Sequence, residues 1–178
     1  VLFRSTAIYR GLRLARQPGL VPLGQNPDTA LFEFLDLCSH REDHPLPARD
    51  PVSGQLRVDG DTGIVFVLLP AGTVRLGARR GDPGMAQNDE EAEADELHGE
   101  TVNLDEFLLA RCELTVAQWA RLRGEPFAGE DPLLPAAGMQ WQEALDALRA
   151  ADMSLPSEAQ WEYACRARTT TPWSTGRD

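Results

Sequence analysis

Two short segments with the same helix-start pattern constrain the fold of this chain more than any other feature. Thr115-Val116-Ala117-Gln118 and Ser157-Glu158-Ala159-Gln160 both fit a capping box. In this motif the hydroxyl accepts a hydrogen bond from the backbone N–H three residues later, and the glutamine side chain reaches back to the first residue. The two capped helices are expected to be short. Because short helices are marginal in water, their stability must come from packing against other elements.

A tryptophan accompanies each predicted helix start. Trp119 and Trp161 directly follow the two capping boxes, and Trp141 begins a third predicted helix, on the same face as Leu145 and Leu148. We expect the three indoles to be buried anchors that dock the helices onto a shared core, because large aromatic side chains dominate core energetics. A platform for a carbohydrate or cofactor is the alternative interpretation.

Apolar runs between residues 63 and 110 predict strands. Residues 64–69 form the longest run, with six apolar side chains, and its continuous apolarity indicates a strand buried on both faces. Residues 70–72 predict a turn, after which residues 73–77 return as the second arm of a hairpin. Residues 102–109 predict one or two further strands, interrupted at Asp105-Glu106. Strands followed by short helices indicate an α+β fold with many loops.

Residues 1–61 are interpreted as a junction or linker region with a short helical segment. Ile8 and Leu12 lie at helical spacing near its start, and an apolar patch follows at residues 31–37. Three prolines between residues 45 and 51 then interrupt any regular structure. The chain begins without Met, and we expect it to be a fragment.

The basic residues are all arginine, 17 in number, which excludes a P-loop lysine or a Schiff-base lysine from this stretch. The net charge of −11 is concentrated in residues 81–110, which hold ten acids and no base. This balance argues against a nucleic-acid partner, because phosphate contacts need clustered cations. The acidic stretch lacks the alternating ligands and the turn glycine of an EF-hand, so we expect a solvated loop rather than a calcium site.

No apolar run approaches the about 20 residues that a membrane-spanning helix needs, and no secretory leader is visible. We therefore expect a cytoplasmic protein with no membrane partner. Cys38, Cys112 and Cys165 are far apart in sequence, which supports neither a disulfide framework nor a structural zinc site. Three buried free thiols are expected instead. No residue of the chain is assigned a catalytic or metal-binding role.

Five segments, in order and at compatible spacing, resemble motifs of the formylglycine-generating enzyme family, also called the sulfatase-modifying factor domain. They are residues 63–77 (GIVFVLLPAGTVRLG), 113–119 (ELTVAQW), 138–141 (GMQW), 155–166 (LPSEAQWEYACR) and 171–173 (TPW). The resemblance identifies residues 62–178 as the N-terminal part of such a domain. Its structural motif residues are Pro70, Gly72, Gly77, Thr115, Gln118, Trp119, Trp141, Leu155, Pro156, Ser157, Glu158, Trp161, Glu162, Tyr163, Arg166 and Trp173.

The resemblance implies an irregular, loop-rich α+β fold of the C-type-lectin-like kind, incomplete in this chain. Enzymes of the family oxidise a cysteine of a protein or peptide substrate to formylglycine, with molecular oxygen and a copper ion held by two cysteines. The copper-binding pair and the calcium-binding loops of the family are expected beyond residue 178. Copper and calcium are thus implied for the complete domain only, and this chain alone is expected to be inactive. Gln140 departs from the family pattern, because it replaces the hydroxyl residue that usually starts that helix.

Two other functions share these motifs. One is a non-catalytic C-type-lectin-like binding module in a bacterial multidomain signalling protein, with an upstream domain such as a kinase. The other is a relative of the non-haem iron sulfoxide synthases, whose metal ligands would lie in another domain. A closely spaced cysteine pair downstream would favour the oxidase and its absence the binding module, whereas a histidine-rich helical domain upstream would favour the iron enzyme.

Overall fold

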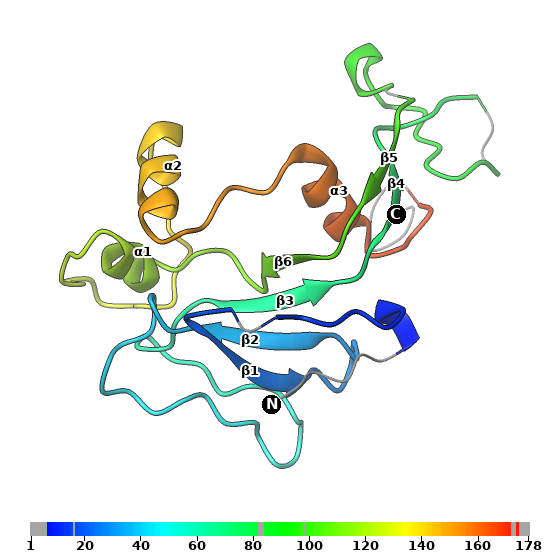
Figure 1. Ribbon diagram of the computed structural model, residues 1–178. Helices are drawn as coiled ribbons and strands as arrows, with labels where there is room; N and C mark the ends of the chain where they lie inside the picture. The colour runs from blue at the N-terminus through cyan, green and yellow to red at the C-terminus, as the bar shows by residue number, and fades with distance from the viewer. Residues whose placement is uncertain (1–6, 16, 82–83, 98, 172–173, 175–178) are drawn as a thin grey trace. The chain divides into compact units, whose positions relative to one another are not determined.

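The computed structural model describes residues 7–15, 17–81, 84–97, 99–171 and 174 of the chain. These residues form short strands, short helices and long connections (Figure 1), which confirms the α+β class and the loop-rich character inferred from the sequence. The elements in chain order are η1 (Ala7–Tyr9), β1 (Leu20–Gln25), β2 (Phe32–Asp36), β3 (Val65–Leu69), β4 (Gly72–Arg75), η2 (Ala94–Glu96), β5 (Thr101–Leu104), β6 (Phe107–Ala110), α1 (Val116–Leu122), α2 (Trp141–Ala150) and α3 (Glu158–Arg166).

The chain divides into two compact units, and each is described by itself. The first unit comprises Val1–Leu69 and Phe107–Leu155, and the second comprises Pro70–Glu106 and Pro156–Asp178. The first unit therefore holds β1, β2, β3 and β6 together with α1 and α2, whereas the second holds β4, β5 and α3.

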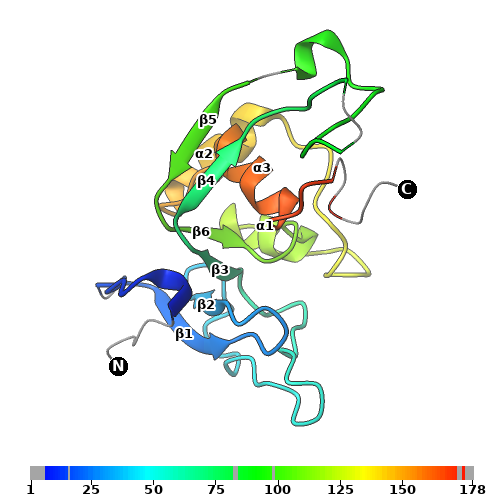
Figure 2. The same ribbon diagram turned by 90° about the vertical axis from the view of Figure 1, so that its right-hand side faces the viewer.

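An antiparallel sheet with the strand order β1-β2-β3-β6 lies in the first unit (Figure 2). Within it, Phe34 of β2 is paired with Phe66 of β3. The side chains of Leu35 and Leu68 are fully buried, which identifies β2 and β3 as the strands that carry the core. The hydroxyl of Tyr9 donates a hydrogen bond to the carbonyl oxygen of Leu68 at 2.8 Å, which attaches η1 to β3.

Two strands of this sheet come from residues 1–61, where the sequence favoured a junction. β2 pairs with β1 on one side and with β3 on the other. The expected helical segment is reduced to the three residues of η1, because Arg10 and Gly11 adopt left-handed backbone, with φ of 48° and 86°. The apolar patch at residues 31–37 is largely the strand β2, whose burial explains its composition. A domain boundary between residues 61 and 62 stays a prediction.

The prediction of a hairpin between residues 64–69 and 73–77 was wrong. β3 is hydrogen-bonded to β2 on one edge and to β6 on the other, so residues 73–77 have no free edge of β3 to pair with. β4 instead pairs with β5 in the second unit, with Gly72 opposite Leu104. The predicted interruption at Asp105-Glu106 is confirmed, because these two residues separate β5 from β6.

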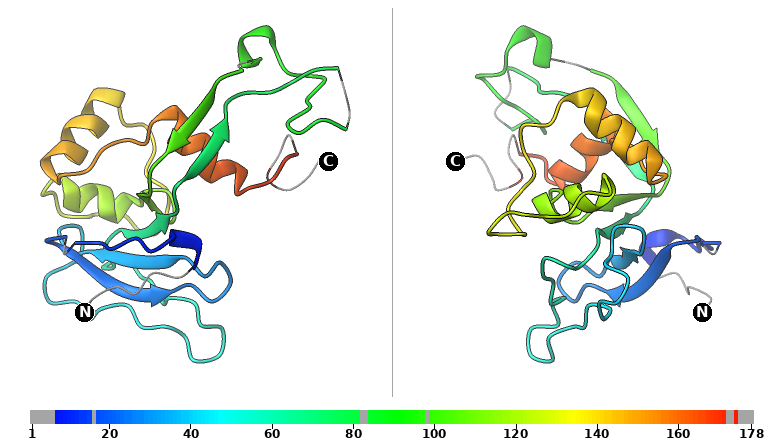
Figure 3. Two further views of the ribbon diagram at one scale, coloured as in Figure 1. Left: turned by 45° about the vertical axis from the view of Figure 1, so that its right-hand side comes forward. Right: turned by 90° about the vertical axis from the view of Figure 1, so that its left-hand side faces the viewer.

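The helices begin where the sequence indicated. The Thr115 hydroxyl accepts a hydrogen bond from the Gln118 backbone N–H at 3.2 Å, and the Gln118 side chain accepts one from the Thr115 N–H at 3.1 Å. Ser157 and Gln160 form the same reciprocal pair, at 3.2 and 2.9 Å. α2 begins at Trp141 without a hydroxyl residue, since the Glu143 carboxylate accepts the Gln140 N–H at 3.0 Å. α1 and α2 contact one another within the first unit (Figure 3).

The expectation that the helix-start tryptophans are buried anchors was wrong. Trp141 is 67% exposed and Trp161 is 60% exposed. Trp119 is half-buried, and its ring lies 5.5 Å from the guanidinium carbon of Arg123 in a cation–π arrangement.

Helical geometry explains part of this difference. Each helical residue advances by about 100° around the axis, so residues two positions apart lie on nearly opposite faces. In α1 the buried residue is Ala117, two positions before Trp119. In α3, Tyr163, two positions after Trp161, lies against Gly72 of β4. The indoles of α1 and α3 thus lie away from the face that packs.

The three cysteines are free, as expected, but they are exposed rather than buried, so that part of the prediction was wrong. Cys165 follows Trp161 by four residues and therefore shares the exposed face of α3. Over the described ranges, no helix is long and apolar enough to cross a membrane.

The acidic stretch in the second unit exposes most of its carboxylates, in line with the expectation of a solvated segment. Its backbone is nevertheless attached at several points. The N–H of Gln87 donates to the carbonyl oxygen of Thr170 at 2.7 Å, and the N–H of Ala78 donates to that of Glu96 at 2.8 Å. Ala92 and Asn88 are buried, so the segment also contributes a small interior of its own.

Candidate functional site

The second unit consists of two separate stretches of the chain, and motif residues from both stretches meet where α3 contacts β4. Tyr163 of α3 donates a hydrogen bond from its hydroxyl to the carbonyl oxygen of Pro70 at 3.1 Å. Gly72 lies against the hydroxyl end of the phenol ring, where a Cβ atom would be 2.5 Å from the hydroxyl oxygen and 2.9 Å from Cζ. Glycine is therefore required at position 72 because the aromatic side chain occupies the space that any other residue would need.

A second contact holds the end of the same segment against α3. The backbone N–H of Gly77 donates to both carboxylate oxygens of Glu162, at 3.0 and 3.2 Å. Arg166 donates to the carbonyl oxygen of Gly77 at 3.1 Å and, through Nε, to Glu162 at 2.8 Å. The predicted pair of Glu162 and Arg166 is thus present, and both members also bind the backbone of Gly77, whose φ is 74°.

These contacts give six of the motif residues a structural role. Pro70, Gly72, Gly77, Tyr163 and the Glu162–Arg166 pair form one hydrogen-bonded cluster, which we call the α3 clamp. Its side-chain polar groups bind backbone atoms or one another. The α3 clamp is suited to fixing the segment 70–77 and not to proton transfer or nucleophilic attack.

The other motif residues serve the starts of the helices or lie at the surface. Ser157 caps α3, Glu158 lies exposed in its first turn, and Pro156 is half-buried. Leu155 is 38% exposed. Trp173 lies outside the described residues, as does His98 of the acidic stretch.

In the first unit, the residues after the Thr115 cap bind the loop that precedes β3. The amide of Gln118 donates to the carbonyl oxygen of Thr62 at 3.3 Å. Arg121 donates to three carbonyl oxygens, those of Ser39, Gly60 and Thr62, at 2.7, 2.6 and 3.0 Å. Burial lowers the pKa of Arg121, although nearby Asp61 and Asp59 act in the opposite direction. Sequence reasoning missed this arginine, because nothing in the pattern around α1 distinguishes it from a surface residue.

A pocket with a volume of about 240 Å³ opens beside this loop. Its floor is buried and consists mainly of Thr62, Ile64 and Val65. Its rim is exposed and includes Cys112 and Glu113, which lie between β6 and the N-cap of α1 along the chain. The pocket therefore combines an apolar floor with a polar edge, the usual composition of small-molecule sites.

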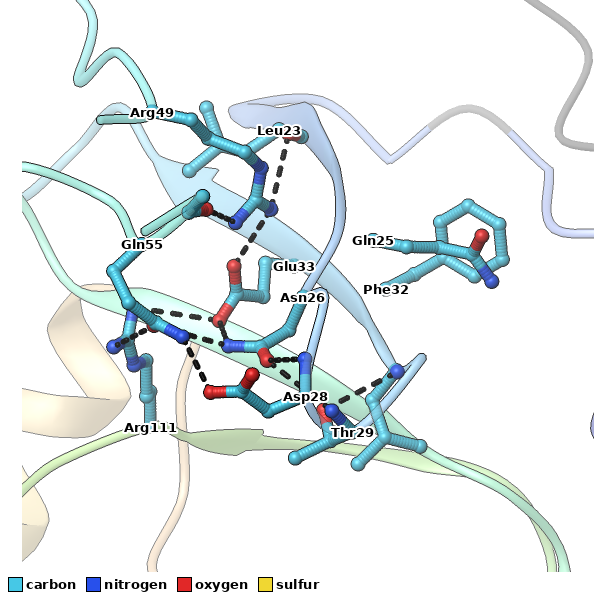
Figure 4. A network of polar contacts seen from close by, with 12 residues as sticks. Leu23, Gln25, Asn26, Asp28, Thr29, Phe32, Glu33, Arg49, Gln55 and Arg111 are labelled. Carbon is cyan, nitrogen blue, oxygen red and sulfur yellow. Dashed lines mark hydrogen bonds and ion pairs between the residues drawn. The ribbon is translucent and has the colours of Figure 1, made fainter. Parts of the chain in front are cut away.

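A buried carboxylate pairs with Arg111 of the pocket lining, in a polar network that links the N-terminal strands to the residue after β6 (Figure 4). Glu33 of β2 is 1% exposed and pairs with Arg49 at 2.7 Å and with Arg111 at 3.4 Å. Asn26 donates to the same carboxylate at 3.0 Å, and Gln55 accepts from Arg111 at 3.1 Å. No sequence motif indicated this network, since its members come from four separate segments.

The described residues do not fit a copper site. Among them, no group of three or more His, Cys, Asp or Glu side chains is placed to hold a metal ion. Along the chain, Cys38 follows β2, Cys112 follows β6, and Cys165 lies in α3. None of them is assigned to copper, and the acidic stretch is not assigned to calcium.

A family model described as "Sulfatase-modifying factor enzyme 1-like domain" matches residues 57–178, more than half of the chain. Comparisons with curated proteins and with solved structures found no match. The matched range contains all five segments whose motifs suggested the formylglycine-generating enzymes, so the resemblance inferred from the sequence is confirmed. The chain belongs to the sulfatase-modifying factor enzyme 1-like domain family.

Proposed function

We propose that this chain provides scaffold segments of a domain that oxidises a cysteine of a protein or peptide substrate to formylglycine. The observation that carries the proposal is the α3 clamp. The motif residues Gly72, Gly77, Glu162, Tyr163 and Arg166 all hold backbone or one another. Family membership supports the reaction, and the clamp supports a scaffold role for these segments.

In this proposal the copper and calcium ions bind residues other than those described, because the described residues include no group of three or more candidate ligands. Copper supplies the redox chemistry with oxygen when it is bound. The residues of this chain contribute by fixing the loops 58–63 and 70–77 through Arg121 and the α3 clamp. The domain would then be an oxidoreductase whose partner is its protein or peptide substrate.

The test compares the natural full-length protein with residues 1–178 alone. Each is incubated with cysteine-containing peptides in oxygenated buffer, with and without copper, and aldehyde formation is followed by an aminooxy probe and mass spectrometry. We expect copper-dependent aldehyde from the full-length protein and none from residues 1–178. If the folded, copper-treated full-length protein forms no aldehyde on any peptide, the oxidase proposal is wrong.

A non-catalytic binding module is the second candidate, and the exposed apolar side chains favour it. Trp141 and Leu134 of the first unit are 67% and 55% exposed, and Trp161 of the second is 60% exposed. Aromatic side chains of this kind are enriched at recognition surfaces. Peptide binding without aldehyde formation, weakened by Trp141→Ala, would support this function over the oxidase.

A further inference from the structure

The pocket of the first unit has room for a ring-sized group. Its volume is about 240 Å³. An engineered apolar cavity of about 150 Å³ already accommodates benzene. Ile64 and Val65 form a buried floor, and Val58, Leu133 and Pro135 supply apolar walls. A monocyclic, apolar group therefore matches the interior in size and in polarity.

The lining carries two carboxylates, Glu113 and Asp59, and one arginine, Arg111. Glu113 makes no ion pair or hydrogen bond with any residue that the structure describes, and it lies at the opening. Asp59 is the second carboxylate of the rim, and its Oδ2 atom lies 3.0 Å from Nε2 of His44. Burial raises the pKa of Asp59, but hydrogen bonds from Thr62 and Asp61 and the charge of His44 together lower it, so this carboxylate is ionised at neutral pH.

Among the lining residues that the structure describes, Arg111 is the cation, and it is already engaged. Arg111 pairs with the buried Glu33 at 3.4 Å and donates to Gln55 at 3.1 Å. Thr115 and Gln118 are occupied by their mutual capping hydrogen bonds. What the pocket offers a ligand is therefore apolar surface inside and carboxylate oxygens at the mouth.

We propose that this pocket is a binding site for a small organic cation with a ring-sized apolar body. The ring lies against Ile64 and Val65, and the cationic group remains at the mouth, beside Glu113 and Asp59. This assignment goes beyond the proposed oxidation of a cysteine and does not depend on it. It follows from the shape of the pocket and from the charge complementarity of its rim.

Three ligands of nearly equal size and different charge test the proposal: benzamidinium, neutral benzamide and the benzoate anion. Cys112 lies on the rim and serves as the reporter, because a bound ligand shields it from alkylation by iodoacetamide. Cys38 and Cys165 are free, exposed and absent from the lining, so their alkylation rates serve as internal controls. We expect benzamidinium to slow the alkylation of Cys112 selectively and benzoate to leave it unchanged.

A variant pair separates the charge effect from a general effect on the thiol. Glu113→Gln should weaken benzamidinium binding about two- to fivefold, the factor expected for a partly exposed ion pair. Glu42→Gln, an exposed substitution outside the pocket, should leave it unchanged. Amide NMR shifts at Ile64 and Val65 provide an independent readout of occupancy. Equal protection by all three ligands, no protection by any, or an unaltered affinity in Glu113→Gln would overturn the assignment.

Discussion

Tyr163 occupies the space in which any residue other than glycine at position 72 would place its Cβ atom. The Cβ would lie 2.5 Å from the phenol oxygen and 2.9 Å from the ring carbons Cε2 and Cζ. The phenol cannot move away without losing its hydrogen bond to the carbonyl oxygen of Pro70. The position of Tyr163 therefore requires a glycine at position 72, although the two residues are 91 positions apart in the sequence.

Gly72→Ala should destabilise the second unit by about 1–3 kcal/mol, the usual cost of inserting a methyl group into a filled site. The measurement is the free energy of unfolding in urea. Gly99→Ala is the matched control within the same unit, because a Cβ there meets only the end of Arg75 at 3.5 Å. A cost at Gly72 no greater than at Gly99 would show that the phenol ring does not constrain position 72.

Glu162→Gln should also destabilise the second unit. The substitution removes the charge that binds both the N–H of Gly77 and the guanidinium of Arg166. A loss of about 1–3 kcal/mol is expected for hydrogen bonds to a charged group. Glu158→Gln, at an exposed position in the first turn of the same helix, should cost less. Hydrogen exchange of the Gly77 amide gives a local readout, and unchanged protection of this amide would contradict the contact.

Glu33→Gln tests the buried network of the first unit. It leaves Arg49 and Arg111 without their anionic partner at a site where the carboxylate is 1% exposed. Breaking a buried pair in this way costs about 3–5 kcal/mol, far more than an exposed pair contributes. Asp61→Asn, which breaks the exposed pair with Arg41, is the comparison and should cost under about 1 kcal/mol. Equal midpoints in thermal unfolding for the two variants would refute the role of Glu33.

Deletion of residues 1–56 should prevent the first unit from folding, although the match to the family model begins at residue 57. The deletion removes β1 and β2, exposes one edge of β3, and removes the partners of Arg111. Circular dichroism and size-exclusion chromatography should show a loss of the cooperative transition and self-association. A monomeric 57–178 chain that unfolds cooperatively would place residues 1–56 outside the folded unit.

Asp50 should titrate far below an ordinary aspartate. Hydrogen bonds from Ser53 and the guanidinium of Arg57, with a further one from Val52, lower its pKa from 3.8 to about 2. A lowered pKa in the folded state stabilises the fold above pH 3.8, and this contribution is lost as the pH falls from 3.8 to about 2. NMR titration of the carboxyl carbon measures the value directly. Arg57→Gln should raise it, and an unchanged titration would show that the ion pair has no effect.

Local patterns were sufficient where the interacting groups are near each other in the sequence. The capping boxes at Thr115 and Ser157 and the pair of Glu162 and Arg166 span three or four residues, so the residue types alone predict them. The break between β5 and β6 at Asp105-Glu106 was predicted from the residue types in the same way. The family assignment had the same origin, because it depends on several such local motifs in a fixed order.

Long-range contacts could not be read in this way. The apolar run of β3 predicted a strand but not its neighbours, and the hairpin inferred from the following turn was replaced by pairing with β2 and β6. The tryptophans at the helix starts were predicted to be buried, yet the faces that pack are those of Ala117 and Tyr163. In helices of seven to ten residues the sequence pattern does not define which face is apolar, so the buried face depends on the elements that pack against the helix.

By itself, the sequence determined the helix starts, the strand-forming runs between residues 64 and 109, the absence of lysine chemistry and the family. Only the tertiary structure decided that Glu33 is buried and pairs with two arginines, that Arg121 binds three carbonyl groups, and that Gly72 lies against the phenol of Tyr163. The reason is physical: the first set depends on hydrogen bonds and propensities within a few residues. The second set depends on which distant segments exclude water from one another, and that is settled only when the chain has folded.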